Sequence, residues 1–333
     1  MQAVHAFIEG NIVAAWVVLF AAFAVLAKCA DLFVTASVSL AFKLRVPKLV
    51  VGIILVSLAT TAPELSVSLL SALQGKPEMA LGNAIGSVIC DDGLALALAG
   101  LFSAAPIMIL PAVFRSSAIF LIAIDIIAFL FVVFDNTLNR LEGAVLVTLF
   151  IGYLVFLYRQ GRSGALKEAT DAERIEGFVE SALPKAIMLF VASLAGIIFA
   201  SEFIITSATT IALFFAVPES IIALTLVALG TSIPEVATCV AAARKREGAI
   251  AVGNILGADI MNVCWVAGAS AMANDLVLGR REILFMFPAM FIIVGAMLIM
   301  LRAGYSLTRT KGLVLFGLYI LYLISFFIVF PPG

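Results

Sequence analysis

Charged residues are scarce in this sequence: Asp, Glu, Lys and Arg together make up 12% of its 333 residues. A soluble domain contains about a quarter charged residues, so this composition excludes an ordinary soluble protein. Histidine is scarcer still, because His5 is the only one, and none of the four cysteines belongs to a C-x-x-C pair. A zinc site and a Ser/His catalytic arrangement therefore lack the residues to form them, and no enzyme activity is expected. The cysteines all lie in apolar stretches and are interpreted as packing residues: Cys29, Cys90, Cys239 and Cys264.

Apolar residues make up 64% of the chain, and its mean hydropathy is +1.20. Runs of about 17–25 apolar residues are long enough to cross a bilayer as helices. We expect about ten such spans, at 11–42, 48–74, 77–103, 116–134, 141–158, 184–214, 219–243, 248–273, 282–301 and 312–331. The first and sixth are longer than a bilayer requires and should be strongly tilted. The sequence therefore predicts an all-α polytopic membrane protein whose surroundings are the lipid bilayer, with no nucleic acid as a partner.

Basic residues in the loops predict the orientation of the chain. With the N-terminus outside, the inner loops contain 15 lysines and arginines and the outer loops contain 4, while Lys28 lies within a span. This bias predicts a cell (inner) membrane protein with both termini on the extracellular or periplasmic side.

A short motif occurs twice, as Thr60-Thr61-Ala62-Pro63-Glu64 and as Thr231-Ser232-Ile233-Pro234-Glu235, with an offset of 235 − 64 = 171 positions. The same offset also pairs Gly82-Asn83 with Gly253-Asn254, Gly86 with Gly257, and Asp31 with Glu202. One unbroken register over this length indicates a duplication. Five spans precede the second copy, and because five is an odd number the second copy should insert upside down. We therefore expect two inverted five-helix repeats, at 1–158 and 184–333, joined by a cytoplasmic linker at 159–183; this is a layout typical of secondary transporters.

Each motif places an acid, Glu64 or Glu235, inside an apolar span, where an ionised side chain costs roughly 2.5–3.5 kcal/mol on insertion scales. Pro63 and Pro234 lack an N–H, so the carbonyls four residues earlier lose their helical partners and can face a cation in a protein cavity. Hydroxyl groups lie beside them at Thr60, Thr61, Thr231 and Ser232. These are oxygen donors rich in carboxylate, which suit hard cations and above all Ca²⁺.

A second element of each repeat adds further polar groups. Asp91 follows Ser87 by one helical turn, and its repeat partner is Asn262. The candidate ion site is therefore Glu64, Glu235, Asp91 and Asn262 with Ser87, the four motif hydroxyls and backbone carbonyls.

Other polar residues have simpler interpretations. A single Pro-Glu pair could be a helix kink with a partnered acid, but two equivalent copies make that interpretation weak. Glycines four residues apart commonly serve helix packing. Asp31 is expected to pair with Lys28 one turn away, while Asp92 and Asp259 should point away from the face of Asp91 and Asn262. Asp125, alone in the fourth span, has no assigned role.

On these residues the sequence resembles the cation/Ca²⁺ antiporter superfamily, and specifically its prokaryotic sodium/calcium exchanger branch. The motifs that carry the resemblance are Gly-Thr-Ser-x-Pro-Glu and Gly-Asn-x-x-Gly-Ser-Asn, here Ala59–Glu64 with Gly82–Ser87 and Gly230–Glu235 with Gly253–Asp259. The resemblance implies the sodium/calcium exchanger fold and antiport of Ca²⁺ against Na⁺ by alternating access, with the ions as substrates and no cofactor. It also implies that Ca²⁺ is bound by Glu64, Glu235, Thr60 and Thr231, and that Na⁺ sites use the serine after each glycine.

Three departures from the family pattern concern the counter-ion. Ala258 replaces the second-repeat serine, Asp91 and Asn262 exchange the usual order of the central pair, and Val88 and Asp259 replace asparagine. A Ca²⁺/H⁺ antiporter with the same carboxylates is therefore the alternative, since clustered acids share protons readily, and K⁺ stays open as a counter-ion. A passive cation channel is disfavoured by the inverted repeat.

Overall fold

The structure is a computed structural model that describes residues 10–44, 46–161, 183–215 and 228–330. These residues form helices α2 (Ile12–Leu44), α3 (Lys48–Val51), α4 (Ser57–Thr60), α5 (Ala62–Leu73), α6 (Pro77–Cys90), α7 (Ala97–Phe102), α8 (Pro111–Asp135), α9 (Arg140–Gly161), α11 (Leu183–Phe214), α13 (Ala228–Thr231), α14 (Ile233–Arg244), α15 (Gly248–Met261), α16 (Gly268–Ala273), α17 (Arg280–Arg302) and α18 (Arg309–Val329). Three π-helical turns, η1 (Gly52–Val56), η2 (Asp91–Leu96) and η4 (Asn262–Ala267), join neighbouring helices. This part of the chain is mostly helical, as predicted, and also contains four two-residue strands.

Eight helical segments in the described ranges are long and apolar enough to cross a membrane. A ninth is obtained when α3–α4 and α5 are counted as one span that bends by 45°. The expected span at 219–243 lies partly outside the described residues, so the count of ten stays a prediction. The linker expected at 159–183 likewise lies almost entirely outside them.

The bend in each motif helix has a local cause. Pro63 is near the first position of α5 and Pro234 near that of α14. The residue where each helix breaks leaves the α-helical region: Thr61 has φ −80° and ψ 2°, and its repeat partner Ser232 has φ −85° and ψ 3°. Proline cannot donate the helical hydrogen bond, so the helix before it ends and a new one begins.

The duplication is visible in the helix boundaries. Adding 171 to the limits of α5, α6, η2 and α7 gives the limits of α14, α15, η4 and α16 residue for residue. Four short strands are arranged symmetrically between the halves: β1 (Ile107–Met108) pairs with β4 (Ser306–Leu307), and β2 (Thr137–Leu138) pairs with β3 (Leu276–Val277). Each strand pair joins one half of the chain to the other.

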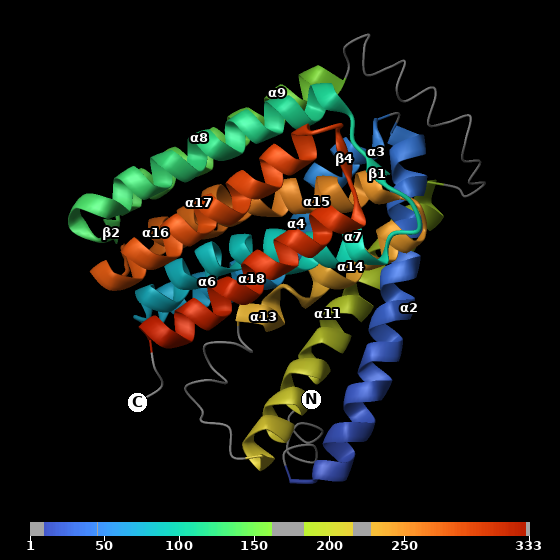
Figure 1. Cartoon of the computed structure of the whole chain (residues 1–333), viewed down its shortest axis with the longest axis horizontal. Coiled ribbons are helices and arrows are strands. Elements are labelled where there is room, and N and C mark those ends of the chain that lie inside the picture. The colour runs from blue at the N-terminus through green and yellow to red at the C-terminus, as the bar shows by residue number, and fades with distance from the viewer. Residues whose placement is uncertain (1–9, 45, 162–182, 216–227, 331–333) are drawn as a thin grey trace.

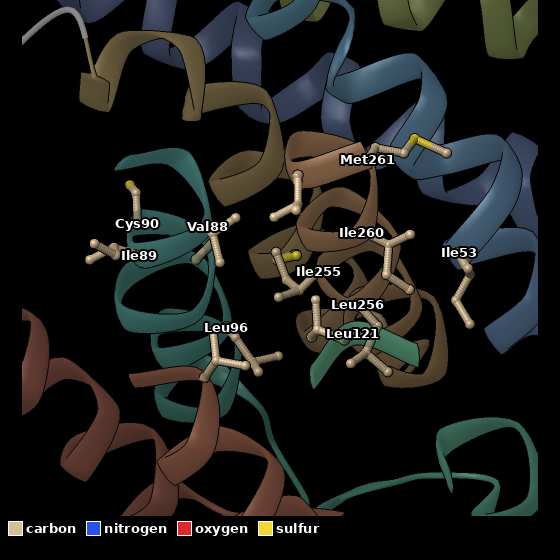
Figure 2. Packing of buried hydrophobic residues seen from close by; sticks show 14 of the residues in the cluster. Ile53, Val88, Ile89, Cys90, Leu96, Leu121, Ile255, Leu256, Ile260 and Met261 are labelled. Carbon is tan, nitrogen blue, oxygen red and sulfur yellow. The ribbon is translucent and has the colours of Figure 1, made fainter. Parts of the chain in front are cut away.

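The helices differ greatly in burial. In the continuous span α15–η4–α16, 89% of the most apolar stretch is buried, against 17% in α2 and in α18. Figure 1 shows α2 and α11 packed side by side and extending away from the other helices. Figure 2 shows the centre of the bundle, where Val88 and Leu96 lie toward Ile255 and Leu256 of α15. Helices α6 and α15, which contact the motif helices α5 and α14, therefore lie at the centre of the bundle.

Candidate functional site

The predicted acids and hydroxyls meet in the centre of the bundle. Glu64 and Glu235 are fully buried, although each belongs to a helix that begins at a proline-induced break. Thr60, Thr61, Thr231 and Ser232 precede them at the same breaks and are buried as well. The breaks therefore turn two carboxylates and four hydroxyls into the protein interior.

Hydrogen bonds connect the two halves reciprocally at this point. The Thr60 hydroxyl donates to Asn254 Oδ1 at 3.1 Å, and the Thr231 hydroxyl donates to Asn83 Oδ1 at 3.3 Å. The two threonines are 171 positions apart, as are the two asparagines. The end of α4 in the first repeat is thus bound to α15 of the second, and the end of α13 in the second repeat is bound to α6 of the first. This exchange is what a two-fold relation between the halves produces.

The two asparagines are themselves held by a matching pair of residues. Asn83 Nδ2 donates to Ser68 Oγ at 3.0 Å, and Asn254 Nδ2 donates to Cys239 Sγ at 3.7 Å. Ser68 and Cys239 in turn donate to the carbonyls of Ala80 and Ala251. In the sequence, Asn83 and Asn254 are recognisable only as equivalent positions of the repeat, and no pattern predicts this positioning role.

The carboxylates have few protein partners. Glu235 Oε1 accepts from the Thr61 hydroxyl at 3.5 Å, and the Glu64 carboxylate lies near the Thr231 hydroxyl. Neither oxygen of Glu64, nor Oε2 of Glu235, has a hydrogen bond of ordinary geometry within the described part of the chain. The charges of Glu64, Glu235 and Asp91 act on one another. In their ionised form, buried acids of this kind need a compensating positive charge.

Asp91 and Asn262 meet directly, as equivalent residues of the two repeats. Asn262 Nδ2 donates to Asp91 Oδ2 at 3.3 Å, and both side chains are buried. Asp91 Oδ1 and Asn262 Oδ1 have no partner among the described residues, and the same is true of the hydroxyl of Ser87. The structure therefore gathers most of the predicted donors in one region and leaves oxygen atoms free on several of them.

Carboxylates alone do not complete a metal cage. Within the described ranges, no three His, Cys, Asp or Glu side chains are arranged closely enough to hold a metal ion by themselves. A bound cation would need hydroxyl, amide or backbone oxygens in addition, which the helix breaks at Thr61 and Ser232 supply. An oxygen-only site of this type favours hard cations.

A second group of acids lies beside this site. Asp92 and Asp259 are fully buried, and their charges act on each other and on Asp125 of α8. The carboxyl oxygens of these three residues have no hydrogen-bond partner in the described residues. The sequence predicted that Asp92 and Asp259 would lie off the face of Asp91, but it contained no signal that Asp125 would join them, because that contact depends on how α8 packs.

The predicted pairing of Asp31 with Lys28 is not found among the ion pairs of the described residues. Asp31 instead lines a surface groove between α2 and α14. Its repeat partner Glu202 lies on the exposed side of α11.

The sequence is similar to those of known membrane proteins. The family model described as sodium/calcium exchanger protein matches residues 14–159 and 185–328. The inner membrane protein YrbG of Escherichia coli is 34% identical over 73% of this chain and 75% of its own length. The sodium/calcium exchanger MaX1 of Methanosarcina acetivorans is 27% identical over 91% of this chain and 96% of its own length.

Solved structures have the same fold. One structure of the sodium-calcium exchanger NCX_Mj superposes with a TM-score of 0.81 at 25% identity, covering 95% of this chain and 99% of that one. The sodium/calcium exchanger family consists of ion exchangers rather than catalytic enzymes. The two matches together support cation/Ca²⁺ exchange, with the ions as substrates. This multi-pass membrane protein belongs to the sodium/calcium exchanger family.

Proposed function

We propose that this chain is a secondary active antiporter that extrudes Ca²⁺ in exchange for Na⁺ by alternating access. The observation that carries the proposal is the pair of buried glutamates, Glu64 and Glu235, held across reciprocal Thr–Asn hydrogen bonds with carboxylate oxygens unpaired. A divalent cation between them would supply the missing positive charge. The ionised glutamates of such a site have a compensating charge only when a cation is bound. The ion-loaded protein is therefore the form that is expected to change conformation.

The proposed ligands are those that the sequence predicted. Ca²⁺ is bound by Glu64, Glu235 and Asp91 with oxygens of Thr60 and Thr231. Thr61, Ser232, Ser87 and Asn262 contribute to the adjoining Na⁺ positions. These sites lie near the membrane midplane between two inverted five-helix repeats, at 1–158 and 184–333, with a cytoplasmic linker at 159–183 and both termini outside. Support comes from the helix boundaries that coincide at the 171-residue offset.

Proton exchange is the second candidate. Ala258 is buried where the first repeat has Ser87, so one hydroxyl that Na⁺ could use is missing. The nearby Asp92 and Asp259 are both buried with their charges acting on each other, and like charges this close favour the sharing of a proton. The two candidates differ in the gradient that drives Ca²⁺ uptake.

Purified protein in liposomes is expected to take up ⁴⁵Ca²⁺ when the vesicles are loaded with Na⁺ and diluted into Na⁺-free medium. Vesicles loaded with K⁺ should show no uptake, with or without an imposed pH gradient. Uptake from K⁺-loaded vesicles that follows the pH gradient would support the proton candidate instead. Uptake that needs no counter-gradient, together with ohmic currents, would indicate a channel. Protein-free liposomes are the control for leakage.

The Asp91–Asn262 pair offers a test of the two-fold site. Asp91→Asn is expected to lower Ca²⁺ exchange at least about tenfold, because it removes one of three interacting carboxylates. The double variant Asp91→Asn/Asn262→Asp returns the acid to the equivalent position of the other repeat and should recover most of the activity. Initial rates of ⁴⁵Ca²⁺ uptake measure both. Failure of the double variant to exceed the single one would contradict the equivalence of the two positions.

A further inference from the structure

A groove of about 610 Å³ lies outside the ion site, on the surface between α2 and α14. One wall is a single face of α14, with residues spaced three and four apart: Ile233, Val236, Ala237, Val240, Ala241 and Arg244. The other wall is a single face of α2, with Phe23, Leu26, Ala27, Ala30 and Asp31. Two helix faces therefore form a largely apolar groove.

The two ends of the groove differ in chemistry. At one end lie Leu229 and Ile233, beside the helix break. At the other end lie Arg244 and Lys245, both exposed, and the Lys245 ammonium donates to the Thr35 hydroxyl at 3.0 Å. The wall along α14 from Ile233 to Arg244 is roughly 17 Å long at 1.5 Å per residue. That is about the depth of one leaflet of a 30 Å hydrocarbon core.

The basic end is available for an anion. Glu247, the nearest acid in the sequence, is paired with Lys48 at 2.7 Å, so it does not neutralise Arg244. Asp31 is the one acid of the groove lining, against two basic residues. A positive entrance and apolar walls would repel Ca²⁺ and Na⁺, which argues against a route for the transported ions.

We propose that this groove binds one anionic phospholipid, with an acyl chain between α2 and α14 and the headgroup phosphate at Arg244 and Lys245. Apolar walls of one leaflet's length suit the chain, and the guanidinium can hold phosphate oxygens through two N–H groups. Basic pockets between membrane helices are known to take lipid headgroups. The bound lipid joins α2 to α14, so it should also stabilise their packing.

The test uses the full-length protein in a neutral detergent, titrated with dioleoyl phosphatidylglycerol or with dioleoyl phosphatidylcholine, and bound lipid is counted by native mass spectrometry. Phosphatidylglycerol is expected to bind more tightly and to raise the apparent unfolding temperature. Arg244→Gln/Lys245→Gln should lower its affinity roughly 30-fold, since each basic residue strengthens binding to an anionic lipid about fivefold. Arg302→Gln/Lys43→Gln removes two exposed basic residues elsewhere and should change little.

Two further arms separate the alternatives. Ala237→Leu fills the groove without changing its charge and should weaken binding of phosphatidylglycerol, whereas glycerol phosphate without acyl chains should not compete. Arg244→Gln alone keeps the Lys245–Thr35 contact and guards against misfolding of the double variant. Equal binding of the two lipids, wild-type affinity in Arg244→Gln/Lys245→Gln, or competition by glycerol phosphate would each overturn the proposal. None of these measurements depends on transport.

Discussion

Glu64→Gln is expected to abolish Ca²⁺ exchange while leaving the protein folded. The substitution keeps the shape of the side chain and removes one of two negative charges that face each other across the repeats. Loss of a carboxylate that pairs with a buried cation typically costs roughly 2–5 kcal/mol. This corresponds to at least about a 30-fold loss of affinity for that cation. Na⁺-driven ⁴⁵Ca²⁺ uptake into liposomes should fall to the level of empty vesicles. Glu235→Gln, at the equivalent position, should do the same.

The matched control is Glu78→Gln, the same chemical change at an exposed position in the first turn of α6. It should leave uptake unchanged. Elution profiles and unfolding temperatures should show Glu64→Gln as stable as the parent or more so, because an unpaired buried charge is unfavourable without an ion. Full Ca²⁺ uptake by the folded Glu64→Gln protein would remove Glu64 from the site and with it the proposed mechanism.

The repeat and the helix breaks were predictable because they depend on local chemistry. Proline at positions 63 and 234 must interrupt the helical hydrogen bonds wherever the chain folds, and both helices break two residues earlier. Burial of Glu64 and Glu235 followed from their place in apolar spans. The 171-residue offset then predicted that Asp91 and Asn262 are equivalent, and they are hydrogen-bonded to each other.

The remaining features depend on how the helices pack. That Thr60 binds Asn254, and not the Asn83 of its own repeat, requires the two halves to interlock, which no local pattern encodes. Asp125 reaches the Asp92–Asp259 group only because α8 packs on the central helices. The expected pair of Lys28 with Asp31 is worth only about 0.2–0.5 kcal/mol on a helix surface, too little to determine where Asp31 points.

The two halves approach each other closely where η1 packs against α15, and glycine makes this possible. A Cβ atom added to Gly52 would stand 2.7 Å from the Ile250 carbonyl oxygen and 2.9 Å from Gly253 Cα. A Cβ added to Gly253 would overlap the Leu49 carbonyl oxygen. All of these neighbours are backbone atoms, so no side chain can rotate away to make room.

Gly253→Val is therefore expected to prevent normal folding, although valine suits an apolar membrane helix. Overpacking a well-filled interior typically costs about 1–3 kcal/mol, and here three side-chain carbons must displace backbone. Gly52→Ala, which adds one carbon, should lower the apparent unfolding temperature by roughly 5 °C. Gly152→Ala is the control, because Gly152 is exposed on α9 and alanine is the better helix former by about 1 kcal/mol. Yield of monodisperse protein and its unfolding temperature measure all three, and a Gly253→Val protein as stable as the parent would show that α15 and η1 can separate without loss of the fold.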